Sequence, residues 1–401
     1  MPYIKHFRGQ GYFVVAIDRN PLAPGAAEAD FLIPVSTFDY PGIRENISES
    51  GLERRIAALC CPATGQAYIS AARSAAWLGV PYPTEEAVLG VLDKYRMWQA
   101  LAELSLTRRK CMHVNPSFDF KAVRFMPAVV KPRSAGGASK GVAYCRSGNQ
   151  LARAVSTAAS LSPNGEAIIE SFCPGEEVKI AGFLQHGRVK SSVIARRCFG
   201  PGDPGVPIGL AVGPSEGCQR NDTSPYLQAM IEQFCRHVGL TDTPFNIDIM
   251  LDPVQPELID FDMALGSIRH LMAESCGIDV MGFFSQLCMG QPLAEKRRWW
   301  RGAAITYLWC RNLDTCGEEL VKLCSGVAVN GTFSPDSGLS RGTVTSSAPL
   351  RVGSFFSKGE TLEAAARAGQ QWLHRIDTYF RNSAKWSAEV VFPIDSAWND
   401  N

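Results

Sequence analysis

The sequence has no excess of charge of either sign, no long apolar run and no cysteine framework. Its 401 residues contain 40 Lys and Arg against 39 Asp and Glu, which gives a net charge of +1. This balance provides no bulk electrostatic reason to expect nucleic acid or an acidic membrane as a partner. No apolar run approaches the roughly 20 residues that span a bilayer. The first residues also lack the apolar core of a signal peptide.

The 13 cysteines contain no CxxC pair and, apart from the neighbours Cys60 and Cys61, are scattered through apolar segments. An odd number without regular spacing is typical of free, mostly buried thiols in a reducing compartment. We therefore expect a cytoplasmic protein.

Strand and helix patterns alternate over the first ninety residues, which is typical of βαβ units and a parallel sheet. The run at 11–18 ends in an acid and has the pattern of a strand buried on both faces. The chain opens on a short helical segment, so either the sheet begins unusually or its first strand is absent. The predicted strands are 11–18, 30–35 and 55–61, and the predicted helices are 2–10, 43–50 and 67–78.

Later segments change character several times. Helices are predicted to begin at Thr84 and at Asp93, where capping residues precede helical patterns. Residues 200–220 are rich in Gly, Pro and Ser and too long for a simple turn, which predicts a functional or mobile loop. A smaller α+β lobe is expected over about 302–392, with strands near 303–308 and 344–346 and a helix over 361–379.

Residues 127–142 combine an apolar run, Lys131 and a loop of small residues from Ser134 to Gly141. This order predicts a strand, a flexible loop and a second strand. Backbone N–H groups in such a loop suit phosphate oxygens, and Lys131 adds a fixed positive charge. Taken alone, a plain surface turn is the more common origin of the pattern.

Three aspartates alternate on two neighbouring predicted strands. Asp248 lies in 245–252, and Asp260 and Asp262 share one face of the hairpin partner 256–262. Carboxylates on one face repel unless a positive charge lies between them, and oxygen ligands suit Mg²⁺ together with substrate phosphates. A solvated strand face with scattered acids is the alternative.

Glu170 and Glu177 flank a break between two apolar strands. Backbone groups freed at this break could hydrogen-bond a planar base, and Glu177 could accept from ribose hydroxyls. On spacing alone, an exposed turn is the better explanation.

In this order, the segments resemble the ATP-grasp superfamily, and most of all its carboxylate–amine ligase and L-amino-acid ligase branch. The stretches 14–21 and 354–368 resemble the first domain and the C-terminal lobe of these ligases. The resemblance covers nearly the whole chain as pattern and not as close identity. It implies an ATP-grasp fold of mixed α/β and α+β class, with a parallel-sheet N-terminal (pre-ATP-grasp) domain, a small ATP-lid subdomain and a large C-terminal antiparallel-sheet lobe. The implied segments are the N-terminal domain 1–90, linker helices 91–125, the lid 126–195, the catalytic lobe 196–300 and the C-terminal α+β lobe 301–401.

The resemblance also implies individual roles. Two lysines and the glycine loop would hold ATP phosphates, and the loop would be mobile when empty and ordered over nucleotide. Met250 and Ile259 would sandwich the adenine, and Glu177 would bind the ribose. The metal would be Mg²⁺, one or two ions, or Mn²⁺. The implied ATP contacts are Lys94, Lys131, Ser134, Gly136, Gly137, Ser139, Gly141, Glu170, Ser171, Phe172, Cys173, Glu177, Met250 and Ile259, and the implied metal ligands are Asp248, Asp260 and Asp262.

The sequence departs from the family pattern at two points. The last metal ligands are usually Glu and Asn, while here both are Asp, which puts the metal distance or number in question. The arginine that often follows is replaced by Ala264, and Arg269 is the expected catalytic arginine, against a structural salt-bridge role. Arg196 and Arg197 would face phosphates, substrate or solvent.

The implied reaction is a ligation. A carboxylate, such as that of an amino acid, attacks the γ-phosphate of ATP to give an acylphosphate, and an amine then displaces phosphate to form an amide. Natural-product biosynthesis is a setting typical of the branch. The implied partners are a small-molecule carboxylate and an amine, without nucleic acid or membrane, and a homodimer is left open. The alternatives are a biotin-carboxylase-like or formyl-transferring enzyme, and a degenerate nucleotide-binding protein.

Overall fold

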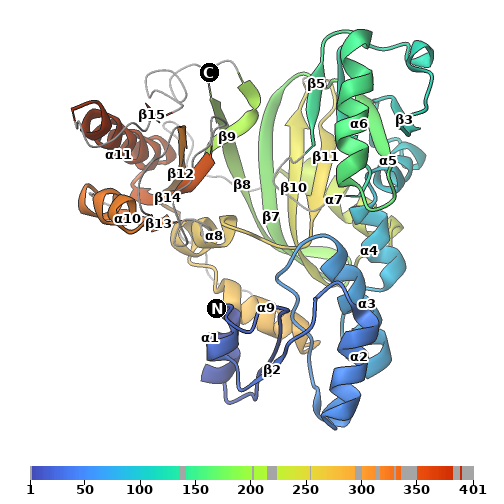
Figure 1. The fold of residues 1–401 in the computed structure, drawn as a ribbon, viewed down its shortest axis with the longest axis vertical. Helices are drawn as coiled ribbons and strands as arrows, with labels where there is room; N and C mark the ends of the chain where they lie inside the picture. The colour runs from blue at the N-terminus through green and yellow to red at the C-terminus, as the bar shows by residue number, and fades with distance from the viewer. Residues whose placement is uncertain are drawn as a thin grey trace.

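In the part of the chain that the computed structural model describes, the strands form sheets of two, four and nine strands (Figure 1). The N-terminal helices lie at the bottom of the view, the four-stranded sheet at the upper right and the C-terminal helices at the left. The expected strand near 344–346 and the loop residues Gly136, Gly137 and Ser139 lie outside the described residues. The structure describes residues 2–134, 141–200, 203–214, 224–252, 254–293, 300–311, 317–328, 331–335, 350–382 and 389–390.

The N-terminal part confirms the predicted parallel pairing. Strand β1 (Val15–Ile17) pairs in parallel with β2 (Phe31–Ile33), with helices α1 (Pro2–Gly9), α2 (Tyr40–Glu49) and α3 (Gln66–Leu78) around them. The prediction that the first strand is buried on both faces is wrong, since every residue of β1 is only partly buried. The two described strands form a sheet that is too narrow for the surrounding helices to bury both of its faces.

The prediction of a third strand at 55–61 is also wrong. The 3₁₀ turn η2 (Glu53–Arg55) is followed by chain without regular structure. Ile56 packs against the apolar cluster of Ile33, Ile43 and Ile47. The apolar residues of this segment therefore serve packing without strand pairing, and periodicity does not separate these two uses.

Two capped helices precede the four-stranded sheet, as predicted. The Thr84 side chain accepts from the N–H of Ala87 and begins α4 (Glu85–Leu92). Asp93 ends α4, and its side chain accepts from the N–H groups of Tyr95 and Arg96 to begin α5 (Lys94–Glu103). This cap makes Lys94 the first residue of its helix.

The four-stranded sheet is antiparallel and has the order β3-β6-β4-β5. Helix α6 (Leu151–Leu161) packs on β4 and β6 around a core that includes Val130, Val155 and Ile169. The predicted strands on both sides of the glycine loop are confirmed as β4 and β5. The strands are β3 (Cys111–Val114), β4 (Ala128–Pro132), β5 (Ala143–Cys145) and β6 (Ala167–Ser171).

The nine-stranded sheet runs β11-β10-β7-β8-β9-β12-β14-β13, with β15 also paired to β12. Its described neighbours are antiparallel. Helices α4, α5 and α7 lie over one end, and α8 and α9 lie beneath the middle. The strands are β7 (Glu176–Gln185), β8 (Arg188–Gly200), β9 (Asp203–Val212), β10 (Thr243–Leu251), β11 (Glu257–Asp262), β12 (Gly302–Arg311), β13 (Gly331–Pro335), β14 (Leu350–Gly359) and β15 (Glu389–Val390), and the helices are α7 (Pro225–His237), α8 (Ile268–Cys276), α9 (Val280–Cys288), α10 (Gly317–Gly326) and α11 (Leu362–Asn382).

The prediction of a loop over 200–220 is wrong for residues 203–212, which form β9. Pairing with β8 and β12 satisfies the backbone, and Leu210 and Val212 are buried. Pro207 lies between two register shifts, where a strand tolerates a residue without an N–H. Residues 215–223 lie outside the described part.

The C-terminal strands extend the same large sheet, since β12 pairs with β9. The expected boundary at residue 195 falls inside β8, and the small sheet already ends with β6. Helices α10 and α11 cover this end around the buried Trp372. None of the described helices is long and apolar enough to cross a bilayer.

Candidate active site

Strand β10 has two chemically different faces. Ile247 and Ile249 are buried in the core between the sheet and helices α4, α5 and α7, while Asn246, Asp248 and Met250 alternate with them and are partly exposed. Because successive side chains of a strand point to opposite faces, these three residues share the open face. Strand β11 pairs with β10 on one side, and Lys131 of β4 reaches its backbone from the small sheet. The candidate site therefore lies where the two sheets meet.

The hairpin places the three predicted acids side by side. Asp248 is the register partner of Asp260, and Asn246 is the partner of Asp262. Each carboxylate has a different polar partner. Asp260 pairs with Lys94, Asp248 with Lys179 and Arg197, and Asp262 accepts a 2.6 Å hydrogen bond from the Tyr68 hydroxyl.

Lys94 and Asp260 form an ion pair between the start of α5 and β11. Burial acts to lower the pKa of Lys94, but Asp260 outweighs it and the pKa is raised. Burial likewise acts to raise the pKa of Asp260, but Lys94 and Lys131 hold it below its ordinary value. Both groups are therefore charged at neutral pH, although 45% of the Asp260 side-chain surface remains accessible.

Lys131 has two oxygen partners from two different sheets. Its Nζ lies 2.7 Å from Glu170 Oε2 on β6 and donates to the Ile259 carbonyl at 3.0 Å. The register between β10 and β11 shifts after Asp248, which leaves Ile259 as the extra residue of a β-bulge. A bulged residue leaves the ladder, and its free carbonyl is the one that Lys131 uses.

A clamp holds the two lysine-bearing elements together. The Arg133 guanidinium donates to both carboxylate oxygens of Asp93, at 2.9 Å to Oδ1 and 2.7 Å to Oδ2, and the Lys94 backbone N–H donates to the Arg133 carbonyl at 3.0 Å. Asp93 is the cap of α5 and Arg133 comes two residues after Lys131. Two-pronged contacts of this kind fix geometry as well as energy, so the clamp sets the positions of Lys94 and Lys131 relative to each other.

Arg109 is a buried member of the site that sequence reasoning missed. Its guanidinium lies 2.6 Å from Glu170 and 3.2 Å from Glu257, and the three side chains are at most 4% exposed. Burial acts to raise the pKa of Glu170, but Arg109 and Lys131 outweigh it and the pKa is lowered. The segment before β3 is mixed and polar, so no periodic signal identifies Arg109.

The open face of β7 and β8 adds two more cations. Arg197 pairs with Glu177 and lies 3.2 Å from Asp248, while Lys179 pairs with Asp248. Burial and the charge of Asp248 raise the pKa of Glu177 against the opposing effect of Arg197. Lys179 was missed, yet the alternation of Glu177 and Lys179 on one strand is the signal that could have found it.

The break between β6 and β7 is tied to its neighbours through the backbone. The Ser171 N–H donates to the Lys110 carbonyl at 2.8 Å, and the Phe172 N–H donates to the Pro127 carbonyl at 3.0 Å. Among the described contacts, the Cys173 N–H has no partner. Gly175 has φ +132°, and a Cβ there would lie 2.5 Å from the Leu251 carbonyl. Only glycine fits this approach of the break to β10.

Arg269 lies on the first turn of α8, where its Nη1 donates to the Gly266 carbonyl at 2.7 Å. In the described part of the chain it forms no ion pair with Asp248, Asp260 or Asp262. Its catalytic role stays a prediction. The guanidinium that the structure brings to the acids is that of Arg197, whereas Arg196 pairs with Glu176 at 3.2 Å and is half-exposed.

Magnesium is compatible with part of this donor set. Within the residues described, no three acidic, histidine or cysteine side chains surround a common point. Asp248 and Asp260 are adjacent oxygen donors, and Mg²⁺ typically binds through one or two carboxylates plus substrate phosphates. One carboxylate oxygen of Asp262, Oδ1, already accepts from the Tyr68 hydroxyl and from the Ala264 N–H. Asp248 and Asp260 therefore fit the ion best.

No family model and no curated protein matches the sequence. Solved structures do match over almost the whole chain. An L-amino acid ligase from Bacillus licheniformis superposes with a TM-score of 0.69 at 14% identity, covering 93% of this chain and 94% of the other. A carboxyaminoimidazole ribonucleotide synthase from Aspergillus clavatus, solved with ATP, gives 0.71 at 11% identity over 94% and 95%. A phosphoribosylglycinamide synthetase from Anaerococcus prevotii gives 0.61 at 14% identity over 93% and 94%.

The chain has the ATP-grasp fold. The fold predicted from the order of the motifs is thereby confirmed. In this ATP-grasp fold, the four-stranded sheet supplies Lys131 and Glu170, and the large sheet supplies the three aspartates. The similarity is one of fold, so the chemistry rests on the side chains present here.

Proposed function

We propose that this protein is an ATP-dependent ligase that joins a carboxylate to an amine through an acylphosphate, with release of ADP and phosphate. One observation carries the proposal. Lys94 and Lys131 come from different elements, and the ammonium groups of both contact acceptors on β11, with Glu170 of β6 as a further partner of Lys131. Two fixed ammonium groups beside paired carboxylates provide the charge complement of a magnesium-bound polyphosphate.

The ion pairs also suggest how the site changes on binding. Phosphate oxygens would replace Asp260 as the partner of Lys94, and Asp260 would then be free to hold Mg²⁺ together with Asp248. The ion would neutralise phosphate charge and polarise the γ-phosphate. Lys131 would keep its contact with Glu170, which fixes its position. The chain contributes positioning and electrostatic stabilisation, as expected for phosphoryl transfer.

The base and ribose would occupy the break between β6 and β7. The Cys173 N–H is available as a donor, and the partly buried Met250 and Ile259 would supply the apolar surface for the base. Glu177 is the register partner of Met250, so its carboxyl lies beside this surface. These positions support the expected adenine and ribose contacts.

The substrates are proposed by class. The carboxylate is that of an amino acid or related acid, and the similarity to an L-amino acid ligase supports this choice. Arg197 lies beside Asp248 and could meet the anionic group of an acylphosphate. Natural-product biosynthesis is the proposed setting.

ADP release tests the proposal. Purified protein is mixed with MgATP and pairs drawn from a panel of amino acids, other carboxylates and amines, with hydroxylamine as a trap that converts an acylphosphate into a hydroxamate. We expect ADP formation that depends on the carboxylate. ADP formation with bicarbonate or formate alone would favour the carboxylating or formyl-transferring reaction. ATP binding without turnover across the panel would favour a nucleotide-binding protein, and no ATP binding would contradict both.

A further inference from the structure

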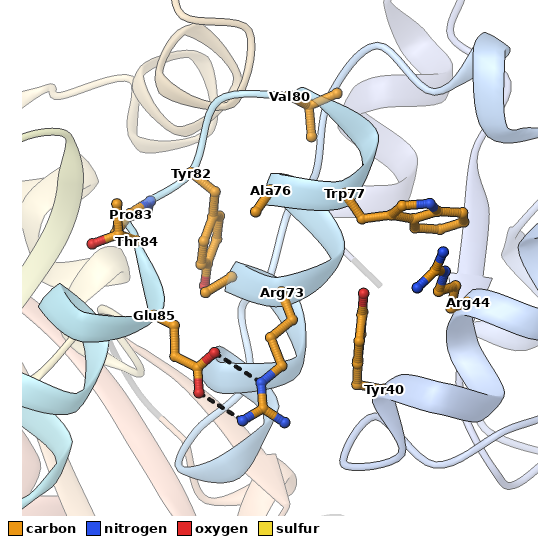
Figure 2. A pocket seen from close by; sticks show the side chains of 11 residues that line it. Tyr40, Arg44, Arg73, Ala76, Trp77, Val80, Tyr82, Pro83, Thr84 and Glu85 are labelled. Atoms are coloured by element: carbon orange, nitrogen blue, oxygen red, sulfur yellow. Dashed lines mark hydrogen bonds and ion pairs between the residues drawn. The ribbon is translucent and has the colours of Figure 1, made fainter.

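The N-terminal part of the chain holds a cavity away from the predicted nucleotide residues. This cavity of about 520 Å³ opens between α2, α3 and the start of α4 (Figure 2). This volume is in the range that small-molecule sites use. None of its residues belongs to the candidate active site. The cavity is lined by Tyr40, Arg44, Ala72, Arg73, Ala76, Trp77, Val80, Tyr82, Pro83, Thr84 and Glu85.

Helix periodicity accounts for the walls. Tyr40 and Arg44 are four residues apart on α2, and Arg73 and Trp77 are four residues apart on α3, so each pair shares one helix face. Figure 2 shows Trp77 extending from α3 toward Arg44, with Tyr40 on the same side. Ala72 and Ala76 also line the cavity. Such small side chains among the aromatic ones leave room for a flat group.

Arg44 is held against one of these walls. Its guanidinium carbon lies 5.3 Å from the centre of the Trp77 ring, a cation–π distance. Stacking on a ring uses the face of a guanidinium and leaves the N–H donors at its edge free for a carboxylate. Among the described residues, Arg44 has no carboxylate partner. The stacked arginine therefore provides a positioned, unpaired positive charge.

The opposite side of the cavity is neutral. Arg73 donates to both carboxylate oxygens of Glu85, at 2.8 and 2.6 Å, and this pair ties α3 to the first residue of α4. The lining contains two arginines and one glutamate, so its net charge is +1. Tyr82 adds a further aromatic side chain to the lining. The cavity is thus aromatic and carries one unbalanced positive charge.

We propose that this cavity binds a small aromatic carboxylate. The carboxylate is held by the edge of Arg44, and the ring lies over Ala72 and Ala76 between the aromatic walls. Contact between aromatic rings adds binding energy beyond that of the apolar area it buries. A hydrogen bond from a charged group is stronger than one between neutral groups. The site needs neither ATP nor Mg²⁺, so it stands apart from the proposed ligase activity.

Calorimetry with benzoate, in the absence of nucleotide, tests the proposal. Benzamide removes the charge and cyclohexanecarboxylate removes the π-system, while both keep the size. We expect benzoate to bind more tightly than either. Arg44→Gln weakens benzoate binding roughly tenfold, the effect of losing one charged hydrogen bond. Arg54→Gln is the matched control, because Arg54 is an exposed arginine of the same part of the chain and does not line the cavity.

A second variant separates local loss from misfolding. Ala76 lines the cavity and is exposed, so Ala76→Phe fills the cavity without entering the core. We expect it to abolish benzoate binding while the far-ultraviolet circular dichroism stays that of the wild type. The proposal is overturned if benzoate does not bind at millimolar concentration. It is equally overturned if well-folded Arg44→Gln and Ala76→Phe proteins bind benzoate as the wild type does.

Discussion

The Tyr68 hydroxyl on α3 donates a 2.6 Å hydrogen bond to Asp262 on β11, 194 positions later in the sequence. Tyr68 is 1% exposed, and the Ala264 N–H donates to the same carboxylate oxygen at 3.0 Å. Burial acts to raise the pKa of Asp262, and the two hydrogen bonds oppose it without cancelling it. A helix of the N-terminal part therefore orients an acid of the candidate site.

Replacing Tyr68 with Phe removes this donor and keeps the ring. We expect the free energy of unfolding to fall by about 1 to 2 kcal/mol, because a mostly buried acceptor loses one of its partners. Urea denaturation at pH 7 measures the loss. Tyr12→Phe is the control, since Tyr12 is 39% exposed. Equal stability of the Tyr68→Phe variant and the wild type would contradict the role of this bond.

Replacing Lys94 or Lys131 with Met tests the phosphate contacts. Each change removes one charged donor, so we expect ATP affinity to fall roughly ten- to a hundredfold. Calorimetry with a non-hydrolysable ATP analogue and Mg²⁺ measures the effect. Lys110→Met is the control, because Lys110 is exposed and its described contacts involve the backbone. Wild-type affinity in both variants would remove the basis of the nucleotide site.

Asp260→Asn tests the metal assignment. The amide keeps the shape and one oxygen but loses the negative charge that attracts Mg²⁺. Mutating a residue that only supports a metal ligand already weakens metal binding about tenfold or more. We therefore expect the Mg²⁺ concentration for half-maximal ADP formation to rise at least about tenfold. Asp242→Asn is the control, since its amide oxygen can still accept from the His186 N–H. Unchanged ATP turnover in Asp260→Asn would refute the assignment.

Glu170→Gln should weaken the fold in a pH-dependent way. The folded state lowers the pKa of Glu170, so the unfolded chain takes up its proton at higher pH than the folded protein does. The contribution of Glu170 is therefore complete above the ordinary glutamate pKa of about 4.3 and is lost as pH falls through the lower folded value.

The stability difference between wild type and Glu170→Gln is expected to be about 3 kcal/mol at pH 7, the cost of breaking a buried pair, and to shrink below about pH 4. Denaturant titrations at pH 7 and below about pH 4 measure this difference in stability. Glu86→Gln, whose side chain is 81% exposed, should show little change at either pH. A difference that does not vary with pH would contradict the ionised state of Glu170.

Local pattern predicted the parts of this fold that depend on neighbours in sequence. The cap at Asp93 and the alternation around Asp248 are set within a few residues, so both were found. Strand β9 was missed because its Gly and Pro residues resemble a loop until the flanking strands satisfy its backbone. Arg109 was missed because its partners Glu170 and Glu257 come from two distant strands.

The continuity of the large sheet has a mechanical consequence. Strands β10 and β11 share one hydrogen-bonded ladder with β12 and β14, so the acids and the C-terminal strands shift as a single block. Along the chain, the four-stranded sheet joins that block through the short break between β6 and β7, where Gly175 lies. Widening the space around Lys131 would break the buried ion pairs of Arg109 with Glu170 or Glu257, which join the two sheets.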